Sequence, residues 1–228
     1  MSAWNEPAAE PRQATGKPEP LPPVVLLHGA GMLPTMWQSQ VEALGAERRA
    51  VAPWIAGLRP GKRYELSLKT AAAEVIGVLD RSGYASADLV AHQLGAMVAL
   101  QTVADYPERV GRLVISGATV LPGKLALTLQ KTAVRMLPAR TLEQTGLTKG
   151  DLVKALDVMA EADFSSRLAT MEVPTLVIAG QGDTTGLGSA KLLAEKLPNA
   201  RLEVITAGGY PSLENPEAYN RLLLDFLS

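Results

Sequence analysis

One side chain that could take part in chemistry falls at a sharp turn between a strand and a helix. The 228-residue chain has two histidines and no cysteine. Residues 88–91 form an apolar strand and a helix opens at Gly95, so the chain must turn within about three residues. Such a turn lifts its central side chain, here Gln93, above the edge of a sheet. An amide at this point can orient a carbonyl or enolate oxygen, but it is not a nucleophile.

The same stretch resembles the nucleophile elbow of the α/β-hydrolase superfamily, whose pattern is G-x-S-x-G. Residues 88–96 read Asp-Leu-Val-Ala-His-Gln-Leu-Gly-Ala. Ala91 takes the position of the first glycine, His92 the variable position and Gly95 the last glycine. Gln93 stands where the family has its serine. The resemblance therefore implies the fold of the family but not its hydrolytic nucleophile.

A glycine-containing turn near the N-terminus extends the resemblance. Val24 to Leu27 is suited to a central parallel strand. The next residues resemble the His-Gly oxyanion loop of the family, in which backbone N–H groups turn into the pocket. Together with the N–H of Leu94, this loop would hold a developing oxyanion, although His28 is usually a structural turn residue in resembling proteins. The loop consists of His28, Gly29, Ala30 and Gly31.

Two motifs near the C-terminus correspond to the rest of a catalytic triad. Asp183 ends the run Gly-Gln-Gly-Asp, which is similar to the G-x-x-D of the family and matches the triad acid. Gly209 lies in Ala-Gly-Gly-Tyr-Pro, where the family has its catalytic histidine. Because a hydrolase of this design needs a hydroxyl, a histidine and an acid, the sequence disfavours an ordinary serine hydrolase.

Composition excludes several other classes of protein. Lys and Arg number 22 against 23 Asp and Glu, so no excess of positive charge favours nucleic acid. The lack of cysteine excludes disulfides and thiolate metal sites, and two histidines are too few for a histidine-rich one. No apolar run approaches a membrane span, and the N-terminus has no basic-then-apolar signal. We expect a cytoplasmic protein without metal or cofactor.

The elements that must position these residues alternate between strands and helices. The fold class expected is α/β, with an α/β-hydrolase-like, mostly parallel sheet of about six strands and helices on both faces. The helix after Pro34 should bury Met36, Trp37, Val41 and Leu44 on one face. Further strands are expected at 49–53, 113–116, 174–180 and 201–205, and further helices at 66–82, 189–197 and from Pro216 onward.

The chain divides into a leader, a core and a cap. Residues 1–22 are rich in proline and predict a disordered leader. Residues 23–119 and 171–228 would form the core. Residues 120–170, with helices at 124–137 and 150–162 and no strand between them, would form a small helical cap. The basic residues of the first cap helix form either an ordinary solvated face or a weak docking patch for an acidic carrier domain; they are Lys124, Lys131 and Arg135.

Three functions are compatible with this pattern. We favour a cofactor-free, non-hydrolytic enzyme of lyase, isomerase or cyclase type, acting on a small apolar or polyketide-like molecule in a capped pocket. Gln93 and the oxyanion loop would orient the substrate oxygen, burial would make Asp183 a stronger general base, and Tyr210 would donate a proton. Trp54 departs from the family pattern, and it either forms part of the wall of this pocket or packs under the loop that follows it. The intact glycine turns and Asp183 support this first function.

The second function is a catalytically inactive pseudo-hydrolase that binds a small ligand or a protein partner. The third is a hydrolase with a different nucleophile, such as Asp183 or Ser116, although neither residue sits at the elbow. An enclosed apolar cavity beside Gln93 would favour the first function over the second.

Overall fold

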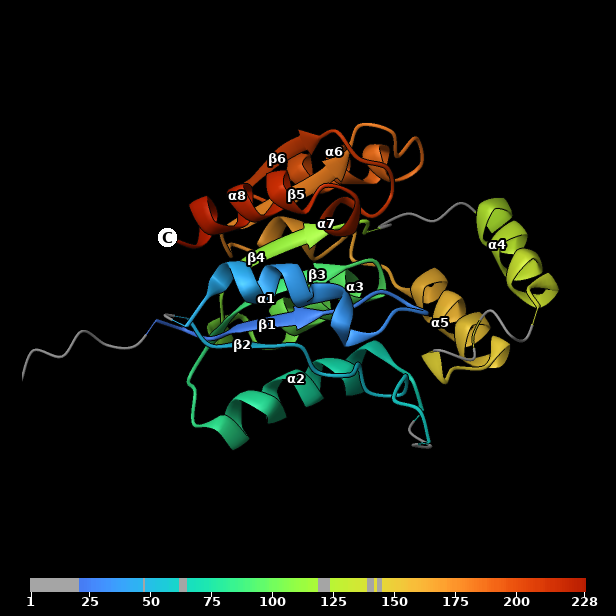
Figure 1. The fold of residues 1–228 in the computed structure, drawn as a ribbon, viewed down its shortest axis with the longest axis horizontal. Coiled ribbons are helices and arrows are strands. Elements are labelled where there is room, and N and C mark those ends of the chain that lie inside the picture. The colour runs from blue at the N-terminus through green and yellow to red at the C-terminus, as the bar shows by residue number, and fades with distance from the viewer. Residues whose placement is uncertain (1–20, 47, 62–64, 119–123, 139–141, 143–144) are drawn as a thin grey trace, which may run out of the picture.

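The computed structural model describes residues 21–46, 48–61, 65–118, 124–138, 142 and 145–228 (Figure 1). The predicted leader falls almost entirely outside these residues. The described strands form one sheet of six parallel strands in the order β2-β1-β3-β4-β5-β6, which confirms the expected fold class. The strands are β1 (Val24–Leu27), β2 (Ala50–Val51), β3 (Ala87–His92), β4 (Val110–Ser116), β5 (Thr175–Gly180) and β6 (Ala200–Ile205).

Helices cover both faces of the sheet (Figure 1). One face carries the helices whose apolar side chains pack on Leu89 and Ala91, and the other carries those that pack on Val90 and Val114. This alternation follows from the two-residue period of a strand. The first face holds α2 (Leu68–Ser82), α3 (Leu94–Asp105) and α6 (Gly186–Lys196), and the second holds α1 (Gln38–Leu44) and α8 (Pro216–Leu227), which follows the short α7 (Pro211–Glu214).

The segment after β1 departs from the expected helical pattern. Residues 34–37 form a 3-10 turn before α1 begins, and Val41 is 37% exposed rather than buried. Gln40 is buried instead, and its amide donates to Asn220 Oδ1 at 2.7 Å. A 3-10 turn has three residues per turn, so it shifts the phase of every side chain that follows it in the helix. The expected strand at 49–53 is also shorter, because only β2 pairs with β1.

A buried ion pair joins the second face of the sheet to the C-terminal helix. Arg48 donates to the Asp88 carboxylate, and both side chains are almost fully buried. The same guanidinium donates to the carbonyls of Pro22 at 3.1 Å and Leu227 at 2.7 Å. Burial raises the pKa of Asp88, while Arg48 and Arg112 oppose that rise. A single guanidinium therefore holds three distant segments of the chain together.

Two helices, α4 (Lys124–Met136) and α5 (Lys149–Glu161), separate β4 from β5 and lie beyond the carboxyl ends of the strands (Figure 1). Thr148 and Asp151 cap the start of α5 reciprocally, as their spacing predicts. Lys131 forms an ion pair with Asp157 of α5, so one cation of the suggested docking patch holds the two helices together. The side chain of Lys124 lies outside the described residues. The division into core and cap and the carrier docking remain predictions.

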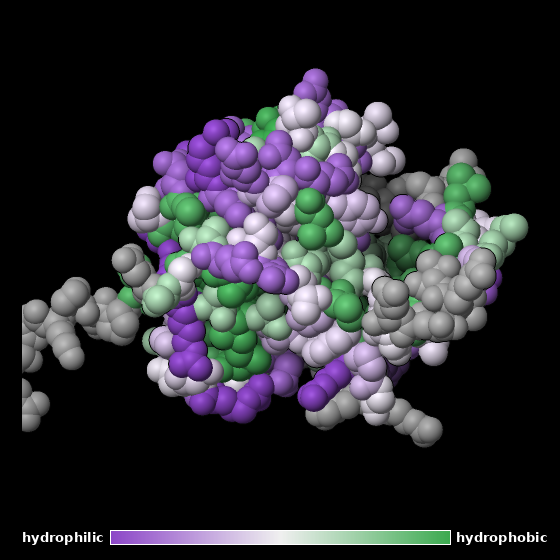
Figure 2. All heavy atoms as spheres, in the orientation of Figure 1, coloured by the Kyte–Doolittle hydropathy of each residue, from purple (hydrophilic) through white to green (hydrophobic). Residues whose placement is uncertain are grey.

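Exposed apolar side chains are found on α4, where Leu129 is 63% and Met136 79% exposed. In the space-filling view, apolar residues appear on this helix, whereas hydrophilic residues dominate over β6 and α8 (Figure 2). None of the described helices combines the length and apolar character needed to cross a bilayer.

Candidate active site

The turn between β3 and α3 has the strained geometry that its sequence predicts. Gln93 has φ 48° and ψ −114°, and no other non-glycine residue in the described ranges has a positive φ. Its backbone is fixed on both sides, because its N–H donates to Ser116 O at 3.0 Å and its carbonyl accepts from Met97 N at 3.2 Å. A Cβ at Gly95 would collide with the carbonyl oxygen of Leu27, so only glycine lets α3 pack directly on the end of β1.

The side chain of Gln93 is partly exposed and lies between two glycines. A Cβ added at Gly29 would come within 2.9 Å of Gln93 Oε1, and one added at Gly117 would come within 3.1 Å of Gln93 Cγ. Both glycines therefore make room for this amide. Gly29 belongs to the predicted oxyanion loop, so the structure brings that loop and Gln93 together.

His28 holds the turn after β1. Its Nε2 accepts from the N–H of Ile55 at 3.2 Å, which leaves Nδ1 to donate to Gly29 O at 2.9 Å. Burial lowers the pKa of His28, so the ring is neutral at pH 7. The edge of its ring packs against Trp54, with centroids 5.4 Å apart. Trp54 lines a groove of about 460 Å³ with Val78 of α2, and the lining of this groove does not include Gln93.

Asp183 follows β5 and caps the start of α6. One carboxylate oxygen, Oδ1, accepts from Gly186 N at 2.7 Å and from Thr185 Oγ1 at 3.3 Å. The other, Oδ2, faces Gly209, where an added Cβ would lie 3.9 Å away. The carboxylate is half-buried rather than enclosed in an apolar pocket. Asp183 and residue 209 therefore lie close together beyond the ends of β5 and β6.

His92 is the site residue whose surroundings the sequence did not reveal. It is fully buried, and its Nδ1 lies 3.0 Å from Ser116 Oγ on the neighbouring strand. Its Nε2 has no hydrogen-bond partner among the described residues. Burial lowers the pKa of His92 to about 4, and the charge of Asp183 and the bond to Ser116 only partly oppose this. His92 and Ser116 lie opposite each other at the ends of the neighbouring strands β3 and β4. This pairing is the signal from which their contact could have been found.

The low pKa of His92 predicts acid sensitivity. Between pH 6.5 and about pH 4 the unfolded chain binds a proton that the folded chain excludes, so the free energy of unfolding falls as pH falls. The full contribution is about 3 kcal/mol, present above pH 6.5 and lost by about pH 4. Denaturant unfolding between pH 7 and pH 4 measures it. His92→Gln should unfold with a shallower pH dependence over this window, and an unchanged slope would contradict the assignment.

Tyr210 lies beside His92, with ring centroids 5.5 Å apart, and is 42% exposed. Its N–H donates to Glu214 Oε1 at 3.1 Å, which fixes the turn before α7. Gln93, Asp183 and Tyr210 thus follow the carboxyl ends of β3, β5 and β6, but no hydrogen bond links them to one another within the described part of the chain.

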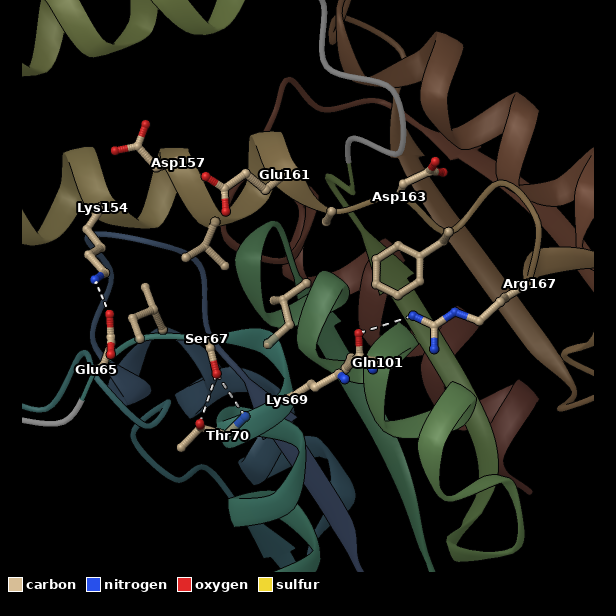
Figure 3. A pocket seen from close by; sticks show the side chains of 15 residues that line it. Glu65, Ser67, Lys69, Thr70, Gln101, Lys154, Asp157, Glu161, Asp163 and Arg167 are labelled. Carbon is tan, nitrogen blue, oxygen red and sulfur yellow. Dashed lines mark hydrogen bonds and ion pairs between the residues drawn. The ribbon is translucent and has the colours of Figure 1, made fainter.

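A large cleft lies elsewhere in the described part of the chain. This cleft, of about 820 Å³, opens between α5 on one side and the start of α2 and the middle of α3 on the other (Figure 3). Its lining does not include Gln93, Asp183 or Tyr210. The enclosed pocket expected beside Gln93 is therefore not this cleft. No group of His, Asp and Glu in the described residues is arranged to hold a metal ion.

Comparison with known proteins extends these observations. A family model described as the alpha/beta hydrolase family matches residues 24–222. "Putative carbamate hydrolase RutD" of Caulobacter sp. (strain K31) is 27% identical over 242 residues, covering 90% of each chain. A 2-hydroxy-6-oxo-6-phenylhexa-2,4-dienoate hydrolase of Burkholderia cepacia is 26% identical, covering 90% of this chain and 87% of its own.

Solved structures share the fold. A hydrolase from Pseudomonas aeruginosa PA01 superposes with a TM-score of 0.78 at 23% identity, covering 91% of this chain and 90% of its own. The enol-lactonase from Burkholderia xenovorans LB400 also has a TM-score of 0.78, at 18% identity, covering 93% of this chain and 94% of its own. At these identities the likeness concerns the fold alone.

Proposed function

Because the chain belongs to the alpha/beta hydrolase family, we propose that it is a cofactor-free enzyme that acts on a small organic carbonyl compound without forming a covalent acyl-enzyme. The reaction is of lyase, isomerase or cyclase type. The enzyme names of the relatives support catalysis. Gln93 and Gly209, at the positions of the family's serine and histidine, argue against the usual acyl-enzyme route.

The conformation of Gln93 is the observation that carries this proposal. A non-glycine residue at φ 48° and ψ −114° costs about 1–3 kcal/mol and persists only where its surroundings enforce it. Such strain is concentrated at active sites. The fold therefore still presents the elbow side chain toward the oxyanion loop, although that side chain is now an amide.

In the proposed reaction the Gln93 amide N–H and the N–H of Leu94, at the start of α3, donate to the substrate carbonyl oxygen. Asp183 Oδ2 takes a proton from the carbon next to that carbonyl, and the electron pair of the C–H bond moves onto the oxygen as an enolate. Tyr210, a residue that is 42% exposed, gives its hydroxyl proton to a different atom of the enolate. Asp183 then releases its proton to solvent and the Tyr210 oxygen takes one up, so both groups return to their starting state. No bond to the protein forms at any step.

Proton exchange tests this function without knowledge of the natural substrate. The protein is incubated in D₂O with enolisable probes such as acetylacetone and ethyl acetoacetate, and loss of the exchangeable proton is followed by NMR. Both Asp183→Asn and Gln93→Ala should slow the catalysed exchange by about a hundredfold. The asparagine can still accept from Gly186 N–H, so the cap of α6 is kept.

The matched control is Asp163→Asn, which changes an exposed carboxylate that accepts hydrogen bonds from the N–H and the hydroxyl of Ser165. It should leave exchange unchanged. Exchange at the uncatalysed rate with every probe would count against the proposed enzyme and leave a ligand-binding pseudo-hydrolase. Equal rates in all four proteins would exclude Asp183 and Gln93 from the reaction.

One contact favours a second candidate, a hydrolase with a different nucleophile. Ser116 Oγ lies 3.0 Å from His92 Nδ1, which is the distance of a serine–histidine pair, and the relatives are named as hydrolases. Both side chains are fully buried, so a substrate could reach Ser116 only after a local rearrangement. A fluorophosphonate probe and mass spectrometry of the labelled peptide decide this point. An adduct on Ser116 would replace the first proposal, and an unlabelled protein would exclude the second.

A further inference from the structure

The large cleft between α5 and the core has two walls that are joined by hydrogen bonds at both ends. Lys154 of α5 donates to Glu65 at 3.0 Å, and Arg167 donates to Gln101 of α3 at 3.3 Å (Figure 3). The space between these contacts is about 820 Å³, which is the size of a small-molecule site. A ligand there would touch neither Gln93 nor any other group of the candidate active site.

The floor of the cleft combines apolar surface with one fixed amide. Leu66 and Phe164 are buried and line it together with Val158. Gln101 is 5% exposed, and its amide is held by Asp105 at 2.6 Å and by Arg167. The floor therefore suits an aliphatic chain, with a polar group at one end.

Opposite charges face each other across this floor. Lys69 lies on the core wall and Glu161 lies on α5, at the opposite wall of the cleft (Figure 3). Within the described residues neither side chain forms an ion pair. The neighbouring acid Asp157 points away from the core wall and is matched by Lys131. Among the described lining residues, the cleft is thus left with one cation outside any ion pair, Lys69, and with two such carboxylates, Glu161 and Asp163.

The position of Lys69 adds to this argument. It lies in the first turn of α2, a turn without an acidic residue, where the positive end of the helix dipole disfavours a cation. An anion bound beside Lys69 would relieve this local conflict. An ammonium group beside Glu161 would match the other wall.

We propose that this cleft binds a zwitterionic small molecule, with its carboxylate at Lys69, its ammonium group at Glu161 and an aliphatic chain between them on the apolar floor. This is a second binding site, separate from the elbow. Its occupancy does not depend on whether Gln93 and Asp183 catalyse a reaction, so either proposal can fail alone.

Calorimetric titration with a matched set of probes tests this site. The probes are 6-aminohexanoate, hexanoate and hexylammonium, together with the shorter 4-aminobutanoate and the longer 8-aminooctanoate. At least one of the zwitterions should bind about tenfold tighter than either singly charged probe. Backbone NMR shifts on binding should concentrate at residues 65–70 and 158–167. A zwitterion that binds no tighter than the single charges would overturn the proposal, as would the absence of saturable binding by all five probes.

Variants that change the two charges provide a second test of this site. Lys69→Ala and Glu161→Ala should each remove the advantage of the zwitterion, and Lys69→Glu combined with Glu161→Lys should restore it with the ligand reversed. Lys191→Ala, an exposed lysine of α6, is the control and should change nothing. If Lys69→Ala and Glu161→Ala couple to each other in the unfolding free energy of the ligand-free protein, the two charges pair with one another and the proposal is wrong.

Discussion

Replacing Gln93 by serine and Gly209 by histidine together should create esterase activity at least about a thousandfold above that of either single variant. The elbow conformation that a nucleophile needs is already present at residue 93. Asp183 Oδ2 faces the side chain position of residue 209, where an added Cβ meets no other described atom within 4 Å. Hydrolysis of p-nitrophenyl acetate measures the gain. The single variants should stay near background, because a serine without its base and a base without its serine are both ineffective.

The triple variant, which adds Asp183→Asn, is the control for this experiment. It should lose most of the new activity, because the acid orients the histidine. Equal activity of the double and triple variants would show that Asp183 is not aligned with residue 209. A folded double variant without activity would mean that the oxyanion loop no longer supports acyl transfer, which would also weaken the proposed use of that loop.

The second large effect concerns stability. Asp88→Ala should lower the free energy of unfolding by about 3–5 kcal/mol, because it leaves the buried Arg48 guanidinium without its anion. Urea denaturation measures the change. Arg48→Met combined with Asp88→Leu should cost clearly less than Asp88→Ala alone, since it removes both charges. Some loss remains, because the carbonyls of Pro22 and Leu227 also lose their donor.

An exposed pair supplies the comparison. Arg81 and Glu74 form an ion pair in which both side chains are more than half exposed. Glu74→Ala should cost less than about 1 kcal/mol. If Asp88→Ala costs no more than Glu74→Ala, the buried pair does not stabilise the fold in the way its burial indicates.

The sheet could be predicted because its strands are short apolar runs bounded by glycine or proline. Residues 24–27 form β1 as expected, and the expected strands at 174–180 and 201–205 agree with β5 and β6 within one residue. The amphipathic period placed α2, α4 and α5 within two residues of their ends. The family resemblance is confirmed by the match over residues 24–222. The burial predicted for Val41 was wrong, because the helical period of the sequence does not reveal the 3-10 turn that precedes α1.

The site was predictable only where a local turn defines it. The elbow at Gln93 and the acid at Asp183 could be placed because each follows directly from a strand end. The contact of His92 with Ser116 depends on strand register, and the facing of Lys69 and Glu161 depends on how α5 sits over α2. Neither arrangement can be predicted from the periodicity of the sequence. The burial of Asp183 could not be predicted from the local sequence either, because it depends on what packs over the strand end, and the carboxylate is half-buried instead of enclosed.

The last strand of the sheet has a consequence for the behaviour of the protein in concentrated solution. On its outer side β6 has no neighbouring strand among the described residues, so its backbone N–H and C=O groups can template edge-to-edge association between copies. Arg201 and Glu203 occupy this strand, and Arg201 is held by Asp225 of α8 at 3.2 Å. Charged side chains on an edge oppose such pairing because a second strand would bury them. We therefore expect these two residues to oppose aggregation of the protein through this edge, independently of the chemistry at the elbow.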